Sequence, residues 1–299
     1  MKSYTTLINS YIDKSLNKSN DNVTRGTGLI NDAHRRFLEK YFFNENSTTI
    51  LTVAQQQSYN LPYDFSQLKT GTITIGSLKW TPTEILTRRD WDILNTMQLY
   101  ADIPNNYYIY GGKFNIFPIP STTGNTITFN YKRRTPDLNI ADYATGTISV
   151  TNNSAVMTGS GTAFLTTFLP AAGDVTLKNL WIKITPPKGF DTWYQIQSIQ
   201  SDTQLTLVNP YQETTVSGAS YIIGQMPLLL EDYHDVLVFD ALVTYYSTID
   251  KVKTEEYKER RKEITDLMDD YVGKKSLNVN LASPNIGRNP NLYQNNIGN

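Results

Sequence analysis

The 299-residue chain has no cysteine and only two histidines, His34 and His234. Without cysteine it can form no disulfide, thiolate nucleophile, iron–sulfur cluster or zinc ribbon. Two histidines are too few for a multi-histidine metal centre. We expect His34 to lie half-buried or at the surface of a helix and His234 to make a structural hydrogen bond, and we predict no metal and no other cofactor.

The chain also lacks an excess of charge of either sign. It contains 27 Lys and Arg residues and 28 Asp and Glu residues, which gives a formal net charge of −1. This balance gives no whole-chain argument for binding nucleic acid or an anionic membrane. Charged or titratable residues interrupt even the most apolar stretch, residues 226–246, so we predict no membrane insertion. The polar N-terminal residues lack the apolar core of a signal peptide, as expected for a protein made in the cytoplasm.

Tyrosine, by contrast, is abundant, with 20 residues in a chain of which 18% are charged. Aromatic residues are enriched, and most charged ones depleted, where proteins contact each other. The nearest approach to a catalytic carboxylate pair, Glu84 with Asp90 and Asp92, has nothing in the sequence to orient it. Composition and motifs together favour an interaction protein and argue against an enzyme.

Apolar residues recur at helical spacing near both ends of the chain. The periodicity predicts helices over residues 4–17, 23–43, 228–248 and 254–271. Gly26 and Gly28 weaken the start of the second helix, which allows a start between Val23 and Thr27. The third helix is apolar around most of its circumference, which is typical of the centre of a bundle or of a helix buried by a neighbouring subunit. We expect Thr254 to cap the fourth helix and Gly273 to end it.

Between the helices the pattern changes to short strands. Gly111 and Gly112 separate two strand-like runs, 107–110 and 113–117, and a Gly-Gly pair is the chemistry that a type I′ hairpin turn requires. A further strand follows over 126–133, and a short helix with Thr87 near its cap is expected just before the hairpin. From residue 144 to 225, Thr, Ser, Gly and Val dominate, and six short strands at about ten-residue spacing predict a small antiparallel sandwich or barrel.

The expected fold is therefore α+β, in three parts. Residues 1–143 and 226–273 form an antiparallel helical bundle with a β-hairpin or small sheet, and residues 144–225 form an inserted all-β domain. Residues 274–299, with eight asparagines and two prolines, are too apolar for a solvating tail and too broken for a helix. We predict an extended tail that orders on a partner. Its candidate docking residues are Leu277, Val279, Leu281, Ile286, Leu292 and Tyr293.

The order of three short motifs resembles one known family. Residues 61–65 read Leu-Pro-Tyr-Asp-Phe, residues 111–120 read Gly-Gly-Lys-Phe-Asn-Ile-Phe-Pro-Ile-Pro, and the strand over 127–133 carries Tyr131. Two helices precede these motifs and a helical pair follows them. Over residues 1–135 and 228–272 this pattern resembles the head-to-tail adaptor, or connector, proteins of tailed bacteriophages.

That resemblance implies a structural virion protein at the head–tail interface, assembled in the host cytoplasm. It implies a homo-oligomeric ring, commonly a dodecamer, that binds the portal protein and a tail or further ring protein. The ring joins the DNA-filled head to the tail and lines the channel through which double-stranded DNA leaves. On this interpretation the tail docks on the portal or on an adjacent subunit. The third helix packs between subunits through Tyr233, Val236, Leu237, Phe239 and Tyr245.

Two further groups of residues leave alternatives open. Lys132, Arg133 and Arg134 either contact DNA phosphates or pair with carboxylates of a neighbour, and without a net basic face we favour pairing. The alternative function is a tail-tip or fibre-associated module whose insert binds a host surface glycan. Stacking of Trp181, Trp193 and Tyr194 on sugars would serve that function, although we favour core positions for these three.

Overall fold

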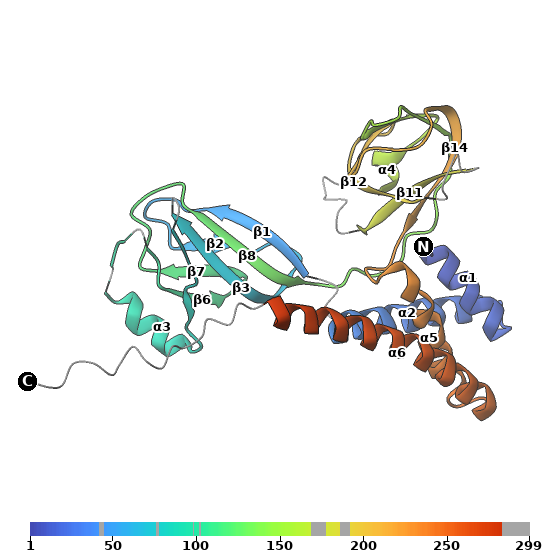
Figure 1. The fold of residues 1–299 in the computed structure, drawn as a ribbon, viewed down its shortest axis with the longest axis horizontal. Helices are drawn as coiled ribbons and strands as arrows, with labels where there is room; N and C mark the ends of the chain where they lie inside the picture. Colours follow the sequence, from blue (N-terminus) through green and yellow to red (C-terminus); the bar gives the residue numbers. More distant parts are fainter. Residues whose placement is uncertain are drawn as a thin grey trace, which may run out of the picture.

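The computed structural model describes residues 1–41, 45–75, 78–97, 99–101, 103–168, 178–185 and 192–282. It shows three groups of elements that meet at a narrow neck (Figure 1). Two small sheets lie at one end of the long axis, four helices lie at the other end, and a β-barrel stands beside the helices. This architecture confirms the expected α+β fold with an all-β module between helical segments.

The helical group consists of α1 (Tyr4–Ser15), α2 (Asn20–Tyr41), α5 (Asp235–Tyr246) and α6 (Lys251–Ala282). The predicted cap of α6 is wrong. The carboxylate of Asp250 accepts from the backbone N–H groups of Val252 and Lys253, which places the cap at Asp250. Thr254 lies one turn inside the helix and donates its hydroxyl to the Asp250 carbonyl. Among the described residues no helix is both long and apolar enough to cross a bilayer.

Helix α2 begins at Asn20, several residues before the predicted start. The glycine that suggested a late start has a packing role instead. A methyl group at Gly26 would lie 2.4 Å from the ring carbon Cε1 of Tyr11, and Tyr11 is fully buried on α1. Gly26 therefore allows the two helices to approach closely, and this packing outweighs its low helix propensity.

The other helix ends also differ from the prediction. A three-residue 3₁₀ helix, η2 (Glu231–Tyr233), precedes α5, so the third helix is shorter than expected. Helix α6 continues through Gly273 to Ala282. A glycine ends a helix when it takes up a left-handed conformation, and Gly273 is not among the glycines with positive φ.

The first sheet has the strand order β1 (Glu45–Leu51), β8 (Thr126–Arg133), β3 (Phe65–Ile75), β4 (Leu78–Trp80). The second has the order β2 (Ser58–Asn60), β7 (Lys113–Phe117), β6 (Asn106–Tyr110), β5 (Thr83–Glu84). The two sheets share a buried aromatic core, in which the rings of Phe114 and Phe129 meet edge to face at 4.5 Å between centroids.

Local sequence signals in this region are confirmed. Gly111 and Gly112 have φ values of 60° and 73° between β6 and β7, as a type I′ turn requires. Helix α3 (Arg88–Asn95) begins after Thr87, whose hydroxyl accepts from the backbone N–H of Asp90 at 3.2 Å.

The all-β module is a closed barrel, which decides between the two predicted alternatives. Its strand order is β10 (Val156–Ser160), β13 (Gln204–Leu207), β12 (Tyr194–Ser201), β11 (Leu180–Thr185), β14 (Val216–Gln225), β9 (Thr147–Val150). A short helix that the sequence did not predict, α4 (Phe164–Phe168), buries Phe164 and Phe168 in the barrel core.

Candidate functional site

Two chain segments connect the barrel to the rest of the molecule, an entry segment over 134–143 and an exit segment over 225–230. The side chain of Gln225 holds them together. Its Oε1 accepts from the backbone N–H groups of Asn139 at 2.8 Å and Ile140 at 2.9 Å, and its Nε2 donates to the Asp137 carbonyl at 2.9 Å. Because Gln225 is 1% exposed, these bonds are shielded from water and fix the end of the barrel to the entry segment.

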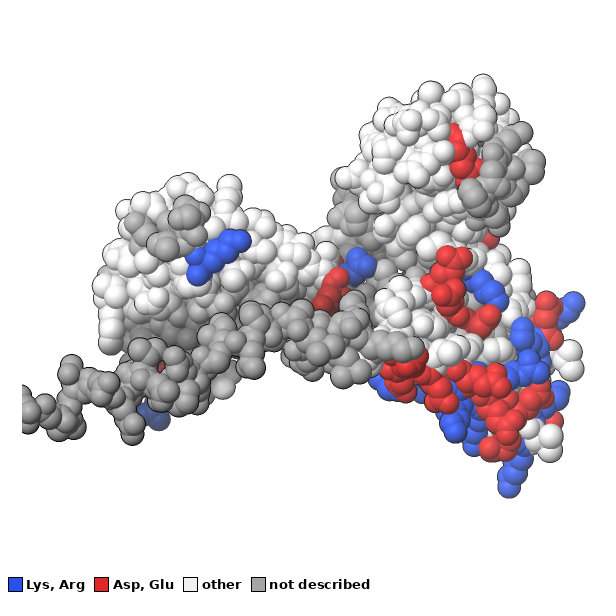
Figure 2. All heavy atoms as spheres, viewed as in Figure 1, with Lys and Arg blue, Asp and Glu red and all other residues white. Residues whose placement is uncertain are grey.

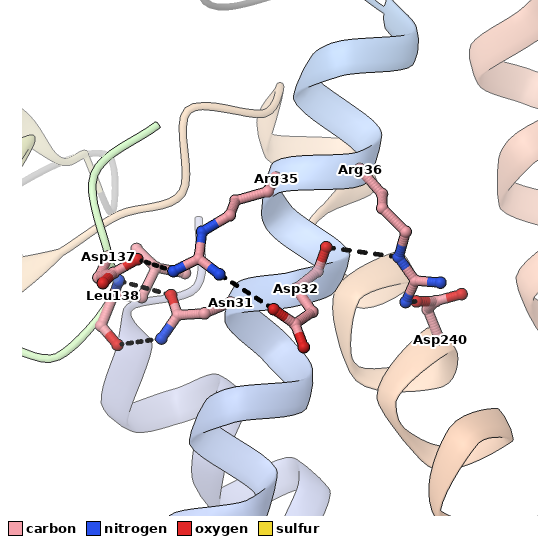
Figure 3. Close-up of polar contacts among 7 residues, drawn as sticks. All are labelled: Asn31, Asp32, Arg35, Arg36, Asp137, Leu138 and Asp240. Carbon is pink, nitrogen blue, oxygen red and sulfur yellow. Dashed lines mark hydrogen bonds and ion pairs between the residues drawn. The ribbon is translucent and has the colours of Figure 1, made fainter. Parts of the chain in front are cut away.

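A second amide fixes the entry segment to helix α2. Asn31 donates from Nδ2 to the Leu138 carbonyl at 3.1 Å and accepts from the Leu138 N–H at 2.7 Å (Figure 3). The amide therefore satisfies both backbone groups of a residue that lies outside any strand or helix. The Leu138 side chain is fully buried in the helical core. Bonding and burial together anchor the entry segment at this point.

Ion pairs surround this anchor. Arg35 joins Asp32 of its own helix, at 3.0 Å, to Asp137 of the entry segment (Figure 3). These side chains are half exposed or more, so each pair contributes little to stability. Asp240 of α5 is different, because its carboxylate is 5% exposed and pairs with both Arg36 of α2 and Arg261 of α6. One buried carboxylate therefore links three helices.

Both histidines hold the exit segment. The Nε2 of His34 accepts from the Leu228 N–H at 3.0 Å. The Nε2 of His234 lies 3.1 Å from the Leu229 carbonyl oxygen, and its Nδ1 accepts from the Lys2 N–H at 3.1 Å. The structural hydrogen bond predicted for His234 is confirmed. The surface or half-buried position expected for His34 is wrong, because His34 is fully buried.

Burial dictates the charge state of these imidazoles. It lowers the pKa of His34 to about 3, with a further lowering from the nearby His234. Burial also lowers the pKa of His234. Both rings are neutral near pH 7, and each neutral ring offers one acceptor nitrogen to a backbone N–H.

The predicted basic group lies beside the neck. Lys132, Arg133 and Arg134 line a cavity of about 310 Å³ together with Arg35 of α2, which had no predicted link to them. Lys132 lies 3.5 Å from the carboxylate of Glu39, and Arg134 donates to a backbone carbonyl in β3 at 3.2 Å. These two cations thus have partners within their own chain. No local pattern signals that Arg35 joins them, because α2 and β8 meet only in the folded chain.

The residues predicted to pack helices between subunits fall into two sets. Val236 and Leu237 are fully buried within the chain's own core, where α1, α2 and α6 surround α5. They are therefore not available to a neighbouring subunit, and the central position in a bundle accounts for the apolar circumference of α5. Tyr233, Phe239 and Tyr245 are partly buried at the edges of this core.

The predicted tail residues divide at the end of α6. Leu277, Val279 and Leu281 belong to α6, where the backbone is helical and not extended as predicted. Ile286, Leu292 and Tyr293 lie outside the described residues.

An exposed apolar surface lies at the sheet end of the molecule, and sequence reasoning missed it. It comprises α3 with its flanking segments, and we call it the 86–103 surface. Its exposed apolar side chains are Leu86, Ile93, Met97, Leu99, Tyr100 and Ile103. Leu86 is 83% and Met97 64% exposed. Several large apolar residues exposed in one segment are typical of a contact surface.

Two of the three sequence motifs meet in the first sheet, whereas the Gly-Gly motif forms the β6–β7 hairpin of the second. The carboxylate of Asp64 accepts the hydroxyl of Tyr131 at 2.8 Å, and the ring of Phe65 stacks on that of Tyr131 at 5.6 Å. Burial and the neighbouring Asp64 raise the pKa of Tyr131 to about 12, so the phenol remains a donor. The Leu-Pro-Tyr-Asp-Phe step thereby fixes the start of β3 against β8, whose end continues into the neck.

A family model described as SU10 adaptor protein matches residues 2–153. The match spans α1, α2, both sheets and the entry segment, and it covers more than half of the chain. The chain belongs to the SU10 adaptor protein family. It is a phage head–tail adaptor, and this confirms the resemblance found in its motifs. No curated protein matches the adaptor.

The family is structural, and the adaptor is therefore a structural phage protein. Within the described part of the chain, no three His, Asp or Glu side chains are grouped so that they could hold a metal ion. Most of the barrel and helices α5 and α6 lie beyond the matched residues. The neck thus joins the family's matched region to a module that the family model does not cover.

Proposed function

We propose that the adaptor forms a closed homo-oligomeric ring between the portal and the tail, at the head–tail interface of the virion. The observation that carries this proposal is the way the neck is built. Buried side chains such as Gln225 and Asn31 lock the barrel and helix α2 to the entry segment, which continues from β8 of the first sheet. A subunit that transmits force between head and tail needs its groups of elements to keep fixed relative positions, whereas a flexible linker would let them rotate.

The surfaces of the helices, the sheets and the barrel suit different contacts. Interleaved acidic and basic side chains cover the helices, whereas the visible faces of the sheets and barrel carry few charges (Figure 2). We assign the 86–103 surface to a contact with the portal, because it is an exposed apolar surface at the sheet end of the molecule. We assign contacts between subunits to three partly buried residues of the helical group, Tyr233, Phe239 and Tyr245. The predicted tail, 274–299, is assigned to the portal. Repeating one head-to-tail contact around an axis closes a ring.

The charge distribution suits a channel through which DNA passes. Strong phosphate binding requires several unpaired cations on one face. Lys132 and Arg134 are instead engaged by Glu39 and by a backbone carbonyl of their own chain. A ring lined in this way would hold double-stranded DNA weakly and let it move. The expected pairing was with carboxylates of a neighbour, whereas these contacts lie within one chain and that of Arg134 is to a backbone carbonyl.

The test is co-assembly with the cognate portal protein, followed by electron microscopy. We expect a defined ring on the portal. Ile93→Asp combined with Met97→Asp should abolish it, because both side chains are exposed on the proposed contact surface. Val252→Asp is the matched control, since Val252 is 80% exposed but lies on α6. A chain that stays monomeric without affinity for the portal would overturn the proposal.

A further inference from the structure

The outer wall of the barrel carries a pocket of about 410 Å³, which lies within the range of small-molecule sites. Three aromatic side chains line it, Trp181 of β11, Trp193, which directly precedes β12, and Tyr194 of β12. Leu180 and Ile182 on either side of Trp181 are fully buried in the barrel. Because side chains alternate along a strand, Trp181 points outward. The core position expected for Trp181 is therefore wrong, whereas Tyr194 is partly buried and packs against the barrel core from the pocket side.

The polar atoms of Trp181 and Tyr194 are already occupied within the protein. Trp181 donates its indole N–H to Asn179 at 3.0 Å, and Asn179 also accepts from Gln195 at 3.2 Å. Lys183 lies over the ring of Trp193, 5.5 Å from its centroid. Trp181 is thus held in place by a hydrogen bond at its ring edge and Trp193 by the Lys183 cation. What these side chains offer to a ligand is apolar ring surface.

The rim of the pocket beside Tyr194 offers hydrogen-bonding groups. Gln212 is exposed and lines the pocket, and its side-chain amide bonds to no other described residue. Glu213 lies beside it, with one carboxylate oxygen 3.5 Å from the Tyr194 hydroxyl. The amide provides both donors and an acceptor, and the carboxylate provides acceptors.

We propose that this pocket binds a neutral saccharide. A pyranose ring has an apolar C–H face that packs on an indole and a rim of hydroxyls that both donate and accept. The pocket presents the complementary pair, an aromatic wall and an amide–carboxylate rim. This site is independent of ring formation, since it lies on the outside of the barrel and uses none of the proposed ring contacts.

Other ligand classes fit less well. Glu213 is the one charged side chain among the described residues that line the pocket, and its negative charge opposes a phosphate or an acidic sugar. A cationic ligand would meet Lys183, which lies over Trp193. An extended peptide usually adds to a free strand edge, and the barrel is closed.

The test is saturation-transfer NMR on the full-length protein with glucose, galactose, mannose, N-acetylglucosamine, rhamnose and a trisaccharide of each. We expect transfer to the ring protons of at least one sugar. Trp193→Ala should weaken that binding at least about tenfold through loss of the stacking surface. Gln212→Ala should weaken it about fivefold through loss of a hydrogen bond, and this exposed side chain can be removed without affecting folding. Val156→Ala, exposed elsewhere on the barrel, is the matched control.

Two results would overturn the proposal. One is the absence of transfer to every sugar at 10 mM. The other is binding of the sugar to the Trp193→Ala and Gln212→Ala variants that is as strong as its binding to the Val156→Ala control. Neither result bears on the ring, because portal co-assembly is measured separately and the three variants lie outside the proposed ring contacts.

Discussion

The two buried histidines make the stability of the adaptor depend on pH in a direction that the structure fixes. His34 is neutral in the folded chain, where burial lowers its pKa to about 3, and it returns to about 6.5 when the chain unfolds. Between these values the unfolded chain binds more protons than the folded one. Stability is therefore complete above about pH 6.5 and falls as the solution is acidified.

The size of the effect follows from the same two values. Because the folded pKa lies well below 5, the loss between pH 7 and pH 5 is determined by the unfolded pKa and comes to about 2 kcal/mol for His34 alone. The lowered pKa of His234 acts in the same direction. Protonation would also remove the acceptor that His34 offers to the Leu228 N–H, so acid should loosen the exit segment of the barrel first.

The assay is urea unfolding at pH 5, 6, 7 and 8, comparing the native chain with His34→Gln. Glutamine can accept the same Leu228 hydrogen bond through Oε1, but it does not titrate. The variant should lose about 2 kcal/mol less than the native chain between pH 7 and pH 5. Burial also raises the pKa of Asp142, for example. The contributions of such groups to the pH dependence are the same in both chains, so they cancel in this difference. An identical pH dependence in both chains would refute the argument.

Three further predictions concern packing, charge and the C-terminal residues. Gly26→Ala should cost about 1–3 kcal/mol in urea unfolding, because its methyl group meets Tyr11. Gly28→Ala, with nothing within 4 Å, should stabilise by up to about 1 kcal/mol; equal effects would contradict the close approach of α1 and α2. Replacing both Arg36 and Arg261 with Met should cost about 3 kcal/mol, since the buried Asp240 carboxylate loses both partners; a cost below about 1 kcal/mol would contradict this. Removing residues 283–299 should abolish portal co-assembly without changing Tm, and a large fall in Tm would assign these residues to the core.

The sequence predicted those features that depend on neighbouring residues. The Gly111–Gly112 turn and the Thr87 cap are local, because a positive φ or a hydroxyl near a helix start acts within a few residues. The strands of the barrel were recognised one by one for the same reason. Whether they form a sandwich or a barrel depends on β9 pairing with both β10 and β14. The sequence of a strand does not indicate which second strand it pairs with.

Features that depend on distant contacts were missed or placed wrongly. Gly26 was interpreted as a weak helix position because Tyr11, which requires the glycine, lies on another helix. The apolar circumference of α5 fitted both the centre of a bundle and burial by a neighbouring subunit, and only the fold shows that three helices of the same chain cover it. The neck itself has no sequence signature. Asn31 and Gln225 are ordinary polar residues until the fold brings them to the entry segment.

The backbone pairing at the base of the barrel allows the insertion hypothesis to be tested directly. Tyr143 and Ile223 exchange two backbone hydrogen bonds, each of 2.8 Å, which is the geometry of the last pair before a hairpin turn. Replacing residues 144–222 with Asn-Gly should therefore close the chain as a two-residue type I′ hairpin. The shortened protein keeps the Asn31, Gln225 and His34 contacts of the neck, because none of these lies within the removed residues.

We expect the shortened adaptor to fold, to show a single cooperative urea transition and to assemble on the portal. It should no longer bind any sugar that the full-length protein binds. It loses the bonds from Asn179 to the carbonyls of Met226 and Pro227, so some destabilisation is expected, of about 1 kcal/mol for each lost bond. A Gly-Gly connection in place of Asn-Gly is the control for turn chemistry. If neither version folds, the barrel is part of the core and not an insertion. If both fold but neither assembles on the portal, the barrel itself makes a ring or portal contact.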